Sequence, residues 1–396
     1  MMKKLKHRLQ LSLDAFSEFR HSQSFGGFLL LLFTIIALVW ANSRWADSYV
    51  YLLHVHFAVH LGAWGMNMQL ETWVNDALMA LFFLLVGLEI KRELLIGELN
   101  SAKKAALPIV AAAGGMIFPA LIYLGFNHPY PEFHAGWGIP MATDIAFALG
   151  VLSLLGNRIP RSLFVLLAAI AIADDLGAVL VIALFYTNTL HFNYLIASAV
   201  LFGLLMLLNL GKVRRLTPYL ILGALLWYCV LNSGIHATIA GVLLAAAIPC
   251  RLAQAPLPRL EHDLHTPVNF IIIPIFVLFN AGVTLSAYHV HAALNSPVAY
   301  GIVLGLIVGK VAGLFGSGWG LVKLKWAHLP EGIGFKQLFG LSLLGGIGFT
   351  MAIFITTLAF PGDEYAVNIA KLAIFTSSLC AALFGYVYLR MVNAQH

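Results

Sequence analysis

The sequence predicts an all-α polytopic membrane protein with about 12 transmembrane helices, forming a single domain over residues 1–396. Three observations predict this class: the composition, a series of apolar stretches of membrane-spanning length, and the placement of the basic residues. Apolar residues make up 61% of the chain and charged residues only 10%, whereas soluble domains carry roughly 45–50% and about 25%. Lipid is therefore the expected solvent.

The apolar stretches set the expected helices. A membrane-spanning helix needs roughly 20 mainly apolar residues, and stretches approaching this length recur along the whole chain. They lie near 26–42, 72–90, 105–125, 134–155, 161–186, 193–210, 216–231, 235–249, 266–285, 298–318, 337–360 and 367–390. Between the first two, residues 43–70 form a long connection in which the run from Leu53 to Phe57 alternates apolar and polar residues. Alternation favours a small external hairpin over a further span.

The Lys and Arg residues set the expected orientation. With a cytoplasmic N-terminus, all but Arg44, Lys310 and Lys371 of the 23 basic residues fall in cytoplasmic segments. Cytoplasmic loops of membrane proteins carry such an excess. The pattern predicts a multi-pass protein with both termini in the cytoplasm, and it explains the net charge of +6 without a nucleic-acid partner.

Four ionisable residues fall near the middle of expected spans: Asp144, Asp174, Asp175 and Lys310. Charges at this depth are unfavourable and mark functional sites. One interpretation is a fixed ion pair between Lys310 and one aspartate that ties helices together. Three carboxylates against one amine leave surplus acid, however, and this surplus indicates a site for a mobile cation or a proton.

Asp174 and Asp175 are adjacent in the run Ala171–Gly177. Successive helical residues point about 100° apart, so one carboxylate can face a water-filled cavity while the other faces a partner helix. Carboxylate oxygens suit hard cations such as Na⁺ or Li⁺. Competition between H⁺ and such a cation for this site is sufficient for antiport, provided that the site changes sides only when occupied.

Two expected spans carry helix-weakening residues near their centres. Gly136, Gly138 and Pro140 precede Asp144, and a glycine cluster lies within 340–348, about half the chain further on. Close helix packing is one explanation of such glycines. Their corresponding positions instead favour inverted three-helix repeats, near 105–186 and 298–390, whose discontinuous middle helices cross at the midplane. Asp144 would then offset the positive N-terminal helix ends, and Lys310 the negative C-terminal ends.

Other chemistries receive little support from the sequence. Cys229, Cys250 and Cys380 show no metal-binding or redox spacing, so no cofactor is expected. An intramembrane aspartyl enzyme is an alternative for a pair of buried aspartates, but Gly346-Ile347-Gly348 is followed by Phe349 rather than by an acid. A transporter of another solute with the same fold, such as K⁺, also remains open.

Several runs together resemble the NhaA Na⁺/H⁺ antiporter family, over nearly the whole chain. They are Phe82–Glu93, Ala142–Gly150, Ala173–Ala178, Ser233–Gly241, Gly309-Lys310 and Gly346–Met351. The resemblance implies that Asp175 is the main carrier of Na⁺, Li⁺ and H⁺, and that Asp174 is its partner, gated by or paired with Lys310. Thr143 and Asp144 would shape the crossing of the broken helices.

The resemblance also implies the setting of the activity. It implies electrogenic exchange, in which more H⁺ enters than Na⁺ leaves, in the inner membrane of a bacterium, with a role in sodium and pH homeostasis. It further implies a homodimer held through the external hairpin, and a non-enzymatic protein surrounded by membrane lipid.

A pH-responsive cluster is a further property of the family. The matching residues are Glu89, Lys91, Arg92, Glu93, Glu261, His262 and His265. Imidazole side chains titrate at about pH 6.5 and can therefore act as pH switches. Solvated helix ends are the alternative role for each of them. The chain departs from the family at Pro258, where Lys is frequent, at Thr266, which separates His265 from Pro267, and at Val311, where Pro is common.

Overall fold

The computed structural model describes residues 26–61, 64–97, 99–187, 190–251 and 255–393. Within them, eight helices are long and apolar enough to cross a membrane, and up to 11 spans result if each bent helix pair counts as one span. The protein is therefore a mostly helical, multi-pass membrane protein. The basic N-terminal residues used for the expected orientation, Lys3 to Arg20, lie outside the described residues.

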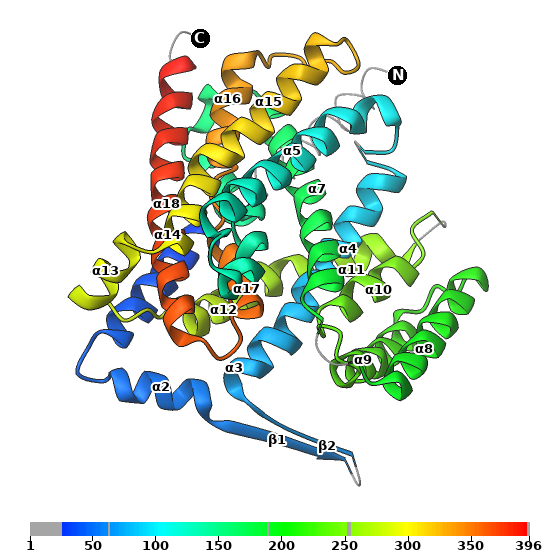
Figure 1. Cartoon of the computed structure of the whole chain (residues 1–396). Helices are drawn as coiled ribbons and strands as arrows, with labels where there is room; N and C mark the ends of the chain where they lie inside the picture. Colours follow the sequence, from blue (N-terminus) through cyan, green and yellow to red (C-terminus); the bar gives the residue numbers. More distant parts are fainter. Residues whose placement is uncertain (1–25, 62–63, 98, 188–189, 252–254, 394–396) are drawn as a thin grey trace, which may run out of the picture.

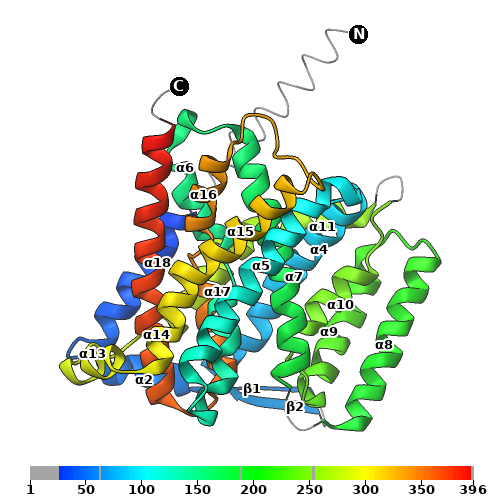
Figure 2. The same ribbon diagram turned by 45° about the horizontal axis from the view of Figure 1, so that its top comes forward.

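The helices form a bundle in which most long elements run between two ends (Figures 1 and 2). Unbroken spans are α5, Ala102–Asn127, α7, Arg161–Phe185, α8, Phe192–Leu210, α9, Leu216–Ser233, and α18, Glu364–Val392. The first described helix, Gly26–Ala41, is bent by 111° against α2, Ala46–His54. Short helices are η3, Gly156–Arg158, and α13, Ala287–Leu294.

Three spans each contain a short π-helical turn. They are α3–η1–α4, with bounds Leu70–Trp73, Val74–Leu78 and Met79–Leu95; α11–η4–α12, with bounds Pro256–Pro267, Val268–Ile272 and Ile273–Asn280; and α14–η5–α15, with bounds Pro297–Leu304, Gly305–Gly309 and Lys310–Lys323. Such turns are frequent at functional sites. Periodicity in the sequence gave no sign of them.

Two spans are broken. The 3₁₀ helix η2, Pro131–Met141, is followed by α6, Ile145–Ser153, with a bend of 42°. Similarly, α16, Phe335–Leu344, is followed by α17, Phe349–Ala359, with a bend of 47°. The first break falls at 142–144, just after the glycines and the proline, which lie within the 3₁₀ helix itself. Proline lacks the N–H that a regular helix requires.

Residues 43–70 include an antiparallel hairpin. Strands β1, His56–Leu61, and β2, Trp64–Gln69, pair from His56 opposite Gln69 to Leu61 opposite Trp64. The alternating stretch becomes a strand only from His56 onward, because Leu53 and His54 still belong to α2. Figures 1 and 2 place α2 and the hairpin together at one end of the bundle, here called the hairpin end.

One expected span differs in length. The stretch 235–249 contains only α10, the nine-residue helix Ile239–Ala247, which rises about 14 Å and is too short to cross the hydrocarbon layer of about 30 Å. Gly234 ends α9 in the left-handed conformation, with φ of 90°. Residues 235–238 then form the turn before α10 and are not helical. Helix α10 packs against α4 and α9 in a second apolar core that is separate from the main one.

Candidate functional site

The two helix breaks, at 142–144 and 345–348, contact each other through hydrogen bonds to backbone carbonyl oxygens. The Asp144 N–H donates to the Ile347 carbonyl oxygen at 2.7 Å, and the Thr143 hydroxyl donates to the Gly345 carbonyl oxygen at 2.9 Å. A Cβ atom on Gly348 would lie 3.2 Å from the Ala142 carbonyl oxygen of the first break, and one on Gly346 would lie 2.5 Å from the Leu306 carbonyl oxygen of η5. The glycines of the second break are therefore needed for close approach, and unpaired backbone groups of each break are satisfied by the other.

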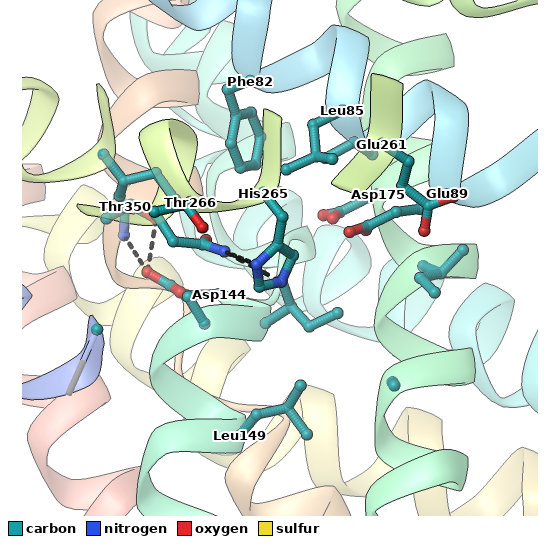
Figure 3. A pocket seen from close by; sticks show the side chains of 18 of the residues that line it. Phe82, Leu85, Glu89, Asp144, Leu149, Asp175, Glu261, His265, Thr266 and Thr350 are labelled. Atoms are coloured by element: carbon teal, nitrogen blue, oxygen red, sulfur yellow. Dashed lines mark hydrogen bonds between the residues drawn. The ribbon is translucent and has the colours of Figure 1, made fainter. Parts of the chain in front are cut away.

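Asp144 serves the N-terminal ends of two helices. Its Oδ1 accepts from the Phe147 N–H of α6 at 2.9 Å. Its Oδ2 accepts from the backbone N–H and the hydroxyl of Thr350, in the first turn of α17, at 3.0 and 2.5 Å. The side chain is buried, and a carboxylate at a helix N-terminus is favoured by the helix dipole. One charge thus joins both broken helices, as Figure 3 shows for Asp144 and Thr350.

Lys310 contacts Asp174, the partner that the family resemblance implied, and not the C-terminal helix ends that its charge was expected to offset. Its Nζ donates to Asp174 Oδ2 at 2.5 Å, and both side chains are fully buried. Lys310 follows the π turn of its span directly. Close packing of α15 on α5 positions it, since a Cβ atom on Gly313 would overlap the backbone of Gly114. The group that contacts the C-terminal end of α16 is the Thr143 hydroxyl, which donates to the Gly345 carbonyl oxygen, and not Lys310.

The two adjacent aspartates face different surroundings. Asp174 faces Lys310, whereas Asp175 lines a cavity of about 820 Å³. Both carboxylates are buried, and Oδ1 of each has no hydrogen-bond partner among the described residues. A buried carboxylate oxygen without a donor is suited to bind a cation or a proton.

The cavity connects Asp175 with most of the expected pH-responsive residues. It is lined by the first helix, α4, α6, α7, α17 and the span of α11 to α12. Its polar and charged lining residues are Glu89, Arg92, Glu93, Asp144, Asp175, Glu261, His262, His265, Thr266, Asn269 and Thr350. In Figure 3, Glu89 and Asp175 lie beside each other, His265 lies in the middle, and Asp144 lies on the far side.

An ion network joins α4 to α11 at this cavity. Arg92 Nε donates to both carboxylate oxygens of Glu261, at 2.9 and 3.1 Å, and Arg92 also pairs with Glu93 at 2.9 Å. Lys91 points elsewhere, because its Nζ donates to the Ala246 and Ile248 carbonyl oxygens at 2.5 Å, where α10 ends. Lys91 is thus a cap for α10 rather than a cavity residue.

The three residues that depart from the family pattern lie in two places, the cavity wall and helix α15. Pro258 and Thr266 line the cavity, so they lie where they can influence its polar groups. Val311 lies in α15 directly after Lys310. Sequence reasoning overlooked Thr350 and Asn269. The position of Thr350 directly after the glycine-rich break was an available signal, because the first turn of a helix has unpaired N–H groups.

A membrane bundle with two broken helices that meet beside buried carboxylates and a polar cavity defines the class of secondary transporters. The chain belongs to a family within this class. The model of the family described as Na⁺/H⁺ antiporter 1 matches residues 17–389.

Similar curated proteins cover nearly the whole chain. The Na⁺/H⁺ antiporter NhaA of Tolumonas auensis is 49% identical over 379 residues, which is 95% of each chain. The Na⁺/H⁺ antiporter NhaA of Vibrio parahaemolyticus is 48% identical over 384 residues, or 95% of this chain and 97% of the relative. That of Bordetella bronchiseptica is 47% identical over 382 residues, or 94% and 96%.

Proposed function

We propose that the protein is an electrogenic Na⁺(Li⁺)/H⁺ antiporter that exports Na⁺ in exchange for more than one H⁺. The relatives named Na⁺/H⁺ antiporter support the exchanged ions. The observation that carries the proposal is Asp175, a buried carboxylate with a free oxygen at the wall of a polar cavity. Net charge movement lets the membrane potential drive Na⁺ export by about 2.3 kcal/mol per charge per 100 mV.

The exchange follows from competition at the aspartates. Asp175 binds either H⁺ or the hard cation, with Asp174 as a second oxygen ligand. When the cation draws Asp174 away, Lys310 loses its buried counter-ion, and an unpaired buried charge is unfavourable. The second proton of the exchange is therefore bound to and released from the Lys310–Asp174 pair, whose two side chains are joined by a 2.5 Å contact.

Alternating access would use the two broken helices. In this proposal η2–α6 and α16–α17 are the middle helices of inverted repeats near 105–186 and 298–390, and they cross at the bilayer midplane. Their mutual hydrogen bonds through Thr143, Asp144 and Thr350 support a coupled movement. Short interrupted helices at the repeat interface are typical of such transporters.

The cavity network would make the transport pH-dependent. Glu89, Arg92, Glu93, Glu261, His262 and His265 line the same cavity as Asp175. Changes in their protonation alter the electrostatic potential at Asp175, because charges that face one cavity are poorly screened from each other. Within this proposal the protein acts in sodium and pH homeostasis as a homodimer of the bacterial inner membrane, with cytoplasmic termini and the hairpin outside.

Everted membrane vesicles with a pH-sensitive dye test the function. After respiration has acidified the lumen, addition of Na⁺ or Li⁺ is expected to discharge the proton gradient, whereas K⁺ is not. Asp175→Asn is expected to abolish the response, because the amide cannot exchange a proton. Discharge by K⁺ alone would favour another solute. Full activity of Asp175→Asn would contradict the site, and loss of a hydrolytic activity in that variant would favour an enzyme.

A further inference from the structure

The α15 span ends in a turn that holds a lysine in a strained backbone conformation. Lys325 has a φ of 62°, in the left-handed region that favours glycine. The Lys325 N–H donates to the Val322 carbonyl oxygen at 3.0 Å, and the Trp326 N–H donates to that of Leu321 at 3.1 Å. In helix ends with these two bonds the left-handed residue is usually glycine. The lysine therefore calls for a reason outside the backbone.

The side chains of this turn face away from the bundle. Leu324, Lys325 and Trp326 are consecutive and all exposed, with exposed fractions of 63% for Leu324 and 73% for Trp326. Figures 1 and 2 place the turn, which lies between α15 and α16, at the end of the bundle opposite the hairpin end. Tryptophan is enriched where membrane spans enter the polar layer, because its ring is apolar and its N–H is polar.

The turn continues an open face of α15. The exposed residues of this face recur every three or four positions, and they are Ala312, Gly316, Trp319 and Lys323. A Cβ atom added to Gly316 would meet nothing within 4 Å. Because α15 belongs to the membrane span Pro297–Lys323, we expect this face to contact lipid chains. Lys325 and Trp326 then lie at the depth of the lipid head groups.

The ammonium group of Lys325 lacks an anionic partner. It makes no hydrogen bond or ion pair among the described residues, and residues 311–330 contain no Asp or Glu. Lys323 differs, because its Nζ lies 5.9 Å from the centroid of the Trp319 ring. The dipole of α15 also favours a cation at this end, but it does not explain the exposed Leu324 and Trp326 on either side of Lys325.

We propose that Lys325 and Trp326 bind the head group of an anionic phospholipid, in the membrane leaflet at the end opposite the hairpin. The ammonium group pairs with the phosphate of the head group, and the indole ring lies just below it. A phosphatidylcholine phosphate already has its own cation beside it, so the site prefers a lipid with net negative charge. The surface is separate from the aspartates and the cavity, and it adds a lipid ligand to the proposed exchange.

Quenching of tryptophan fluorescence by brominated lipids tests the site in vesicles. Brominated phosphatidylglycerol or phosphatidylcholine is added as a minor fraction to ordinary phosphatidylcholine, and the signal of Trp326 is the difference from Trp326→Phe. We expect phosphatidylglycerol to bind beside Trp326 several-fold more strongly than phosphatidylcholine. Lys325→Gln is expected to remove this preference, and Lys325→Arg to keep it. Lys336→Gln, which changes an exposed lysine of α16, is the matched control and should also keep it.

Thermal unfolding separates the lipid contact from a role at the helix end. Lys325→Gly is expected to raise the melting temperature of delipidated protein in detergent, because glycine relieves the left-handed strain. The same variant should gain less from added phosphatidylglycerol than the unsubstituted protein does. A lower melting temperature of Lys325→Gly in detergent would assign the lysine to the helix dipole and would overturn the proposal.

Three further results would overturn the lipid site. They are equal binding of the two brominated lipids beside Trp326, a preference that Lys325→Gln leaves unchanged, and displacement of phosphatidylglycerol by inorganic phosphate. The last result would indicate a site for free anions. None of these measurements uses ion exchange, so their failure leaves the proposed function untouched, and a failure of vesicle antiport leaves the lipid site untouched.

Discussion

At the scale of single residues, the site depends on which of two neighbouring carboxylates finds a cationic partner. Asp174 pairs with Lys310, and Asp175 remains at the cavity. The sequence predicts that the two point in different directions, because successive helical residues diverge by about 100°. Helix geometry alone does not predict which of them meets Lys310, because that depends on the rotation of α7 relative to α15, which packing sets. The family resemblance did imply Asp174, and the structure shows that pair.

Removing one member of the buried pair is expected to destabilise the protein strongly. Lys310→Ala leaves Asp174 buried without its counter-ion, which costs about 3–5 kcal/mol. Thermal unfolding of the detergent-solubilised protein measures the loss. Combining Lys310→Met with Asp174→Leu is expected to restore most of the stability while transport stays absent. Lys323→Ala, at an exposed position of the same helix, is the control. Equal melting temperatures for Lys310→Ala and the control would refute the pair's contribution.

At the scale of helices, close backbone contacts hold the broken and π-containing spans in place. The sequence predicts the two interruptions, since glycine and proline weaken helices locally. It does not predict the 3₁₀ form of η2 or the three π turns, because the hydrophobic periodicity of these stretches is that of ordinary spans. It also places too long a helix at α10, because apolar composition does not show that residues 235–238, after the turn at Gly234, are not helical.

Two glycines of α15 give a matched test of this packing. Gly313→Ala is expected to force α15 away from α5, because its Cβ atom would overlap the Gly114 backbone. Gly316→Ala meets nothing within 4 Å, and alanine favours the helix by about 1 kcal/mol. Thermal unfolding should therefore fall for the first variant and hold or rise for the second. The reverse order would contradict the packing.

The ion network between α4 and α11 allows a second matched comparison, between a cavity arginine and an exposed one. Arg92→Gln breaks a contact of 2.9 Å to Glu261 at the cavity, so the pH profile of vesicle transport is expected to move. Arg259→Gln breaks a contact of 3.8 Å to Asp263 between exposed side chains, and exposed pairs contribute little. Its profile should match that of the unsubstituted protein. Identical profiles for both variants would exclude Arg92 from the pH response.

At the scale of the whole molecule, a polar cavity lies beside the buried Asp175 in a bundle of apolar spans. The apolar spans and the basic residues predict the membrane bundle, but no pattern in the sequence predicts the cavity. Its lining comes from residues far apart in the chain, such as Phe82, Ile172 and Met351, which look like ordinary core residues in the sequence.

The most direct test is Na⁺ binding to the purified protein in weakly buffered solution, with pH recorded during the titration. Competition for Asp175 predicts that Na⁺ binding releases protons, and that its apparent Kd rises about tenfold per pH unit for each competing proton in the acid range. Asp175→Asn should lose the proton release. Na⁺ affinity that does not change with pH, with no protons released, would contradict competition between the two ions.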